Sequence, residues 1–226
     1  MNNQTFAEKA LQFYSRLDFT INLPEIEVMN PYRFPETFGL VSAFFNRFYS
    51  DSGQRTFIFG INPGRFGAGI TGISFTDPVN LADKCHIPNH LQKKHELSSV
   101  FVYELIEAFG GTELFFNKFY VSAVSPLGFI KNGKNINYYD DKELSKAAED
   151  FIRKCLLQQL DFGAERNCAI CLGGNKNFIF LNRLNQEMNL FEKIIPLEHP
   201  RFIMQYRRKF LNQFLKKYLN ALKNCE

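Results

Sequence analysis

Several features are scarce or absent in this sequence, and each absence removes a class of protein. The 226 residues include no tryptophan and only 4 histidines. No apolar run approaches the roughly 20 residues that cross a bilayer, and the amino terminus lacks the basic-then-apolar layout of a secretion signal. We therefore expect a soluble, cytoplasmic or otherwise intracellular protein without a membrane partner. No repeat or long linker divides the chain, so we expect one domain over residues 1–226, with residues 1–50 packed on it as a helical extension.

Cysteine is the next sparse residue, with 5 copies that show no disulfide-framework spacing. Cys168 and Cys171 form a Cys-x-x-Cys pair, but they lie in a short apolar run, residues 167–172, that is typical of a buried strand. An offset of three places two side chains on opposite faces of a strand. We therefore expect buried structural thiols in a reducing compartment.

Phenylalanine is the residue in excess, with 26 copies in a chain that is 45% hydrophobic and 22% charged. Burial is the ordinary fate of aromatic side chains, so most of these residues must form the core. The formal net charge of +4 favours anionic partners mildly and decides nothing by itself.

Apolar runs and helical patterns alternate along the chain. Strands are predicted at residues 56–61, 118–124, 167–172 and 190–196, and helices at 5–17, 35–49, 98–109, 141–160, 176–188 and 204–222. Uniformly apolar strands between helices indicate a parallel sheet covered on both faces. We expect an α/β protein, a three-layer α/β/α sandwich with a central four-stranded parallel sheet. Ligands of such sheets bind beyond the carboxyl ends of the strands, which directs the search to the loops after residues 61, 124, 172 and 196.

The loop after the first strand carries the strongest signal. Residues 60–75 contain five glycines and one proline, which excludes a helix or strand interior and lets backbone approach a ligand. Asn62 is an uncharged amide that can accept a proton from water and orient it. Taken alone, an Asx turn at the end of the strand explains Asn62 equally well.

This loop resembles the first motif of the uracil-DNA glycosylase superfamily, and most closely that of the single-strand-selective monofunctional family. The family pattern Asn-Pro-Gly-x-Phe-Gly, followed by Thr-Gly-x-x-Phe, is matched without gaps by residues 62–67 and 71–75. The resemblance implies that Asn62 positions the hydrolytic water and that Phe75 stacks on the extruded base. The base-binding residues that it implies are Ile61, Pro63, Gly64, Phe66, Gly67, Phe75 and Ala123.

The loop after the last strand contains His199-Pro200, which matches the start of the superfamily's second motif, His-Pro-Ser. Breaking a glycosidic bond leaves negative charge on the base, which a fixed donor stabilises, and the resemblance gives this role to His199. A helix cap is the structural alternative. The family then continues Ser-Pro-Arg-Asn, a wedge pushed into DNA, whereas this chain reads Arg-Phe-Ile-Met. Wedge and first helical turn both remain open, and the DNA-binding residues expected here are Pro200, Arg201, Phe202 and Met204.

The two middle loops match less well. Ala123 stands where the family has an asparagine that reads the edge of uracil, so Ser122, Ser125 or residues 132–139 would have to replace it. In the third loop, Gly174 and Lys176 resemble a family turn that contacts the DNA backbone, and a helix amino terminus suits a phosphate. An ordinary strand-to-helix turn is the alternative.

The resemblance predicts a monofunctional enzyme that hydrolyses the bond between DNA and uracil or a related base and leaves an abasic site. We expect a monomer that acts on single- or double-stranded DNA and uses no metal or other cofactor. No cysteine precedes Cys85, which excludes the iron–sulfur branch of these glycosylases. The histidines of residues 77–97 fit no zinc spacing, so that segment is predicted to be a surface loop. The alternative function is a non-catalytic damaged-base or DNA-binding protein of the same fold.

Overall fold

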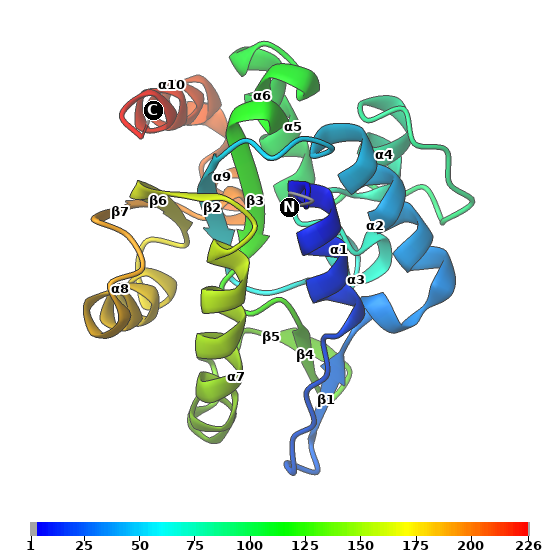
Figure 1. Cartoon of the computed structure of the whole chain (residues 1–226), viewed down its shortest axis with the longest axis vertical. Coiled ribbons are helices and arrows are strands. Elements are labelled where there is room, and N and C mark those ends of the chain that lie inside the picture. The colour runs from blue at the N-terminus through cyan, green and yellow to red at the C-terminus, as the bar shows by residue number, and fades with distance from the viewer. Residues whose placement is uncertain (1–3, 226) are drawn as a thin grey trace.

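Four parallel strands form the central sheet of the computed structural model, which describes residues 4–225 (Figure 1). The strands are β2 (Arg55–Gly60), β3 (Phe119–Ala123), β6 (Ala164–Leu172) and β7 (Lys193–Leu197), in the order β3-β2-β6-β7. All four apolar runs predicted as strands are therefore strands, and the predicted α/β class and four-stranded parallel sheet are confirmed.

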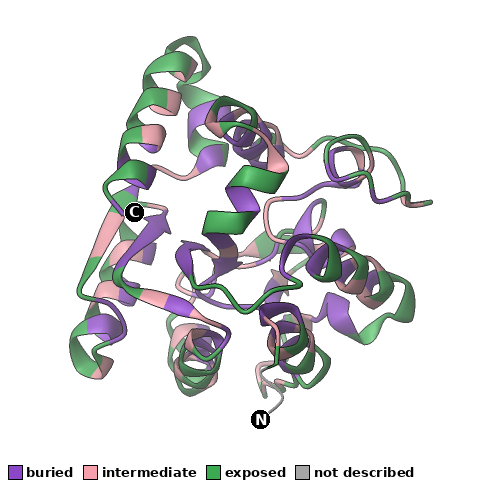
Figure 2. Cartoon of the chain, turned by 45° about the horizontal axis from the view of Figure 1, so that its top comes forward, coloured by how far each residue is buried: buried purple, intermediate pink, exposed green. Residues whose placement is uncertain are grey.

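Helices cover both faces of this sheet, because alternate residues of each strand point to opposite sides. Phe57 of β2 meets Phe6 of α1 (Phe6–Ser15) on one face. Its neighbour Ile58 lines the other face together with Val102 of α5 (Leu97–Phe109). Buried residues accordingly concentrate on the sheet and on the inner sides of the helices (Figure 2). The remaining long helices are α2 (Pro35–Phe48), α7 (Lys142–Leu160) and α8 (Lys176–Met188).

A small antiparallel sheet lies beside the main one and was not expected from the sequence. It consists of β1 (Ile26–Met29), β4 (Gly128–Lys131) and β5 (Lys134–Ile136), in the order β1-β4-β5. A Cβ at Gly128 would lie only 2.7 Å from the carbonyl oxygen of Pro63. Because Gly128 has no side chain, this sheet can approach the Asn-Pro-Gly loop closely.

The carboxyl-terminal helical region differs from the single helix predicted over residues 204–222. It is divided into α9 (Pro200–Tyr206), a 3₁₀ turn (Arg208–Phe210) and α10 (Leu211–Lys223). The shorter elements elsewhere are η1 (Pro31–Arg33), α3 (Ala68–Thr71), α4 (Pro78–Asp83) and α6 (Thr112–Lys118). Among residues 4–225, no helix combines the length and the apolar character needed to cross a membrane.

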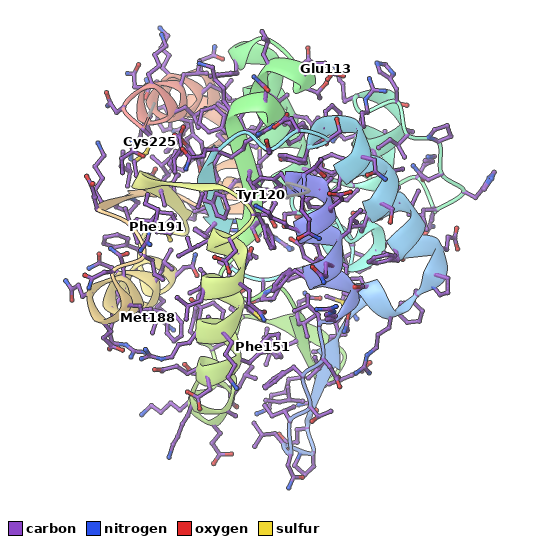
Figure 3. All side chains as sticks on the ribbon, viewed as in Figure 1. Glu113, Tyr120, Phe151, Met188, Phe191 and Cys225 are labelled. Carbon is purple, nitrogen blue, oxygen red and sulfur yellow. A yellow bond between two sulfur atoms is a disulfide. The ribbon has the colours of Figure 1, made fainter. Side chains whose placement is uncertain are left out.

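The expectation of free thiols is wrong for Cys168, which forms a disulfide with Cys225 (Figure 3). The chain returns at the end of α10 to within 5.3 Å, Cα to Cα, of β6. The 57 residues between the two cysteines hid this pairing from local sequence reasoning. Cys171 is free and buried as predicted. Cys85, in the segment predicted to be a surface loop, and Cys155 are also free and buried, and burial raises the pKa of each of the three thiols to about 12.

Candidate active site

The loops after β2, β6 and β7 line an open cavity of about 540 Å³ at the carboxyl edge of the sheet. Its lining includes Ile61, Lys176, His199 and Phe202. The amide of Gly173 donates to the carbonyl of Leu197 over 2.9 Å, which joins two of these loops. The cavity therefore lies beyond the carboxyl ends of the strands, where ligands of parallel sheets bind.

Asn62 follows β2 directly and its side-chain amide is held by backbone from the small sheet. Its Oδ1 accepts a hydrogen bond from the amide of Tyr138 at 3.1 Å, and its Nδ2 donates to the carbonyl of Ile136 at 3.3 Å. These two bonds fix which end of the amide is oxygen. An amide oxygen has two lone pairs, so Oδ1 retains one position with which to accept a hydrogen bond from water.

A chain of buried hydrogen bonds through Tyr138 and Asn177, here called the relay, connects the backbone that holds Asn62 to the main sheet. The hydroxyl of Tyr138 donates to Oδ1 of Asn177 at 2.8 Å. Asn177, fully buried in the first turn of α8, donates in turn to the carbonyls of Gly60 at 3.2 Å and Leu172 at 2.9 Å. Residues 132–139 were expected only as possible readers of the base, and no local sequence signal indicated this support of Asn62.

Phe75 lies at the end of β2 in an unusual conformation. Its φ is 53°, a left-handed value that a phenylalanine seldom adopts and that marks local strain. A Cβ at Gly60 would lie 2.6 Å from the Phe75 ring, so the absence of a side chain there admits the ring. The ring centroid lies 5.7 Å from that of His199, at an interplanar angle of 44°. The first and last motifs thus meet at this point.

His199 is both a helix cap and a potential donor. Its Nδ1 accepts a hydrogen bond from the amide of Arg201 at 3.2 Å, which places the proton of the neutral ring on Nε2. Burial, with a smaller contribution from the Arg201 charge, lowers the pKa of His199 from 6.5 to about 4. The imidazole is therefore neutral near pH 7, and its Nε2–H is left to donate. The two readings of this histidine are compatible.

Phe66, Gly67 and Gly64, three further residues of the predicted base site, lie in the loop after β2. Phe66 is 48% exposed, and its ring centroid lies 5.0 Å from the Arg65 guanidinium and 4.5 Å from the Lys94 ammonium. The amide of Gly67 donates to the carbonyl of Gly64 over 3.3 Å, which turns the loop back on itself. A base contact by Phe66 would thus be made from the exposed rim of the loop.

Ala123 ends β3 and is buried. Two of the residues considered as replacements for the family asparagine use their hydroxyl protons within the protein. Ser122 donates to Oε1 of Gln159, and Ser125 donates to the carbonyl of Leu127 at 2.8 Å. The loss of the asparagine is therefore not offset by a free hydroxyl donor on either serine.

The predicted DNA-binding residues divide between surface and core. Gly174 and Lys176 line the cavity, and the Lys176 ammonium lies 5.9 Å from the centre of the Tyr139 ring. Arg201 and Phe202 are exposed, whereas Pro200 and Met204 are buried. Met204 lies on the inner side of the amphipathic helix α9, so a direct DNA contact would require it to leave the core.

The segment 77–97 is organised by the buried Asp77. This carboxylate accepts hydrogen bonds from the amide of Asn80 at 2.8 Å and from that of Glu96 at 2.9 Å, which joins the two ends of the segment. Within the described residues 4–225, no three metal-ligating side chains come together.

Comparison with known proteins identifies the family of this chain. The model of the uracil DNA glycosylase superfamily matches residues 47–223. This chain belongs to the uracil DNA glycosylase superfamily. Among solved structures, it is similar to SMUG2 of Pedobacter heparinus, with 45% sequence identity, 98% of each chain covered and a TM-score of 0.95. Comparison with curated proteins gave no significant match. The resemblance drawn from the two motifs is confirmed at the level of the family.

Proposed function

We propose that this superfamily member hydrolyses the N-glycosidic bond of uracil or a related base in DNA, leaving an abasic site without cutting the strand. The observation that carries the proposal is that three groups lie at the carboxyl edge of the main sheet. The oriented amide of Asn62 and the ring of Phe75 both follow β2, and the neutral His199 lies against Phe75.

The reaction follows from the roles open to these groups. The target nucleotide leaves the base stack at a cost of a few kcal/mol, which is least for unpaired bases. Phe75 stacks on the base, and the Nε2–H of His199 donates to the base oxygen that gains negative charge. A well-placed donor of this kind lowers the barrier by about 3–4 kcal/mol. Oδ1 of Asn62 accepts a hydrogen bond from the water that attacks C1′ of the sugar. The new C1′–O bond forms as the bond from C1′ to the base nitrogen breaks, the base leaves with the bonding electrons, and the proton of the water passes to solvent or to the departing base.

DNA contacts outside the pocket would come from the cavity rim. Lys176 and the amides near Gly174 suit a phosphate at the start of α8. Arg201 and Phe202, exposed on the first turn of α9, suit the gap left by the extruded base. Because the motifs contribute no lysine that would form a Schiff base, strand cleavage is not expected.

The proposal is tested with a labelled single-stranded oligonucleotide that contains one uracil, followed by treatment with hot alkali. We expect cleavage only after alkali, and none with cytosine in place of uracil. Asn62→Ala and His199→Ala should each reduce excision by at least about 100-fold, the lower end for loss of one donor. Asn167→Ala and His90→Ala, at exposed positions, are the matched controls. Wild-type rates in both site variants would refute the mechanism.

A second candidate is a protein that binds damaged bases without cleaving them. Ala123 favours it, because the buried polar group expected to read uracil is missing and polar recognition provides most discrimination. Binding to uracil-containing DNA without any abasic product, over a panel of deaminated and oxidised bases, would establish this function instead.

A further inference from the structure

The last 27 residues before the carboxyl-terminal glutamate have an unusual charge pattern. From His199 to Cys225 the sequence contains seven lysines and arginines and no aspartate or glutamate. Lys217 is paired with Glu198, but Arg207, Arg208 and Lys209 are consecutive and exposed. A surface of one sign next to the cavity fits a polyanion.

Large aromatic side chains are exposed among these cations. Phe202, Tyr206 and Phe210 are 41%, 60% and 39% exposed, and they recur at every fourth residue. The ring centroids of Phe202 and Tyr206 lie 5.6 Å apart. The Arg207 guanidinium lies 5.6 Å from the Phe202 ring, and the Lys209 ammonium lies 4.9 Å from the Phe210 ring. We call these five residues the α9 strip.

This exposure is not explained by packing of α9, because the helix already has a separate inner face. Ile203 is fully buried and Met204 is 5% exposed, and α9 contacts α5 extensively. The strip begins at the proposed site, since Phe202 lines the same cavity as His199. Four residues of α9 separate Phe202 from Tyr206, on the order of 6 Å at helical rise, and Phe210 follows in the 3₁₀ turn after α9.

We propose that the α9 strip binds the single-stranded DNA that flanks the target nucleotide, with unpaired bases stacking on Tyr206 and Phe210 and phosphates contacting Arg207 and Lys209. Alternating aromatic and cationic groups are the means by which proteins hold single strands without reading sequence. Bases in a duplex are already stacked and paired, so they cannot use these rings. The purpose of the strip rests on the proposed glycosylase function, but the binding itself requires no cleavage.

The test measures fluorescence anisotropy of a labelled oligothymidylate that contains no uracil. Because one stacked base contributes about 1–3 kcal/mol, Tyr206→Ala and Phe210→Ala should each weaken binding at least about 5-fold. Tyr206→Phe, which keeps the ring, should bind as wild type does. Phe34→Ala is the matched control, at an aromatic residue of α2's amino end that is 64% exposed. A 2-aminopurine placed in the oligonucleotide should be quenched by the wild type and not by the double variant.

Salt dependence separates stacking from charge. Arg207→Gln and Lys209→Gln should each reduce the slope of log affinity against log salt by about 0.7, the single-strand value per phosphate contact. The two aromatic variants should weaken binding at every salt concentration with an unchanged slope. Circular dichroism confirms that each variant folds.

Uracil excision is measured in parallel to separate the two proposals. If the double variant Tyr206→Ala, Phe210→Ala binds oligothymidylate as tightly as the wild type, the strip proposal is overturned, whatever the excision rate. If binding falls but the wild type excises no base, the strip stands and the glycosylase proposal fails. Equal loss of duplex and single-strand binding in the aromatic variants would also overturn the stacking mechanism.

Discussion

His199 should make the protein lose stability in mild acid, and the size of the loss follows from its surroundings. The folded protein holds the pKa of this imidazole at about 4, against 6.5 for an unburied histidine. The unfolded chain therefore takes up a proton on His199 more readily than the folded protein does. The associated stability is complete above pH 6.5 and is lost as the pH falls from 6.5 towards 4.

The gap between these two values corresponds to about 3 kcal/mol once the pH is below 4. Linkage gives about 2 kcal/mol of this loss between pH 7 and pH 5. His199→Asn removes the titration but keeps a side-chain oxygen that can cap α9 at the amide of Arg201. The free energy of unfolding of this variant should therefore fall by about 2 kcal/mol less than that of the wild type over the same interval.

Urea unfolding at pH 7 and pH 5, followed by circular dichroism because the chain has no tryptophan, measures this difference. His90→Asn, at an exposed histidine, is the control and should retain the wild-type pH dependence. Identical pH dependence in the wild type and His199→Asn would refute the assignment of a half-buried, neutral imidazole with a lowered pKa. A direct titration of the His199 ring by NMR spectroscopy checks the same conclusion.

Three further predictions concern the support of the site and of α9. Gly60→Ala would place a methyl group 2.6 Å from the Phe75 ring and should reduce excision at least about 10-fold by displacing that ring; Gly39→Ala, where the added methyl group meets nothing within 4 Å, should leave the rate unchanged. Tyr138→Phe removes the hydrogen bond to Asn177 and should cost about 1 kcal/mol of stability while lowering kcat more than it raises KM, whereas unchanged kinetics would show that the relay does not position Asn62. Ile203→Ala should destabilise the protein by about 2–5 kcal/mol because it empties a fully buried site, and urea unfolding would measure this.

The sequence predicted the main sheet because its strands are apolar throughout. Strand β2 is buried at every residue, so its six residues stand out from the helical patterns on either side. The small sheet had no such signal, since the strand Lys134–Ile136 has two exposed polar residues out of three. The pairing of β4 with β1 brings together segments about 100 residues apart, which no local pattern reveals.

Of the candidate site, the sequence indicated the motif residues but not the hydrogen bonds that hold them. Asn62 and His199 were identified through motifs, and their positions at one edge followed from the parallel sheet. The relay was invisible, because Tyr138 meets Asn177 across 39 residues and Asn177 meets Gly60 across 117. The division of α9 into an exposed side and a buried side also required the structure, since residues 201–204 suit a wedge and a helix equally well.

The part of the chain that matches the family model is shorter than the part that supports the candidate site. The family model begins at residue 47, yet β1, at residues 26–29, forms one edge of the small sheet whose other edge leads into the backbone that holds Asn62. A chain shortened to residue 47 would retain every motif residue and still lose that edge. We therefore expect the proposed activity to depend on the segment before residue 47 as well as on the motif residues.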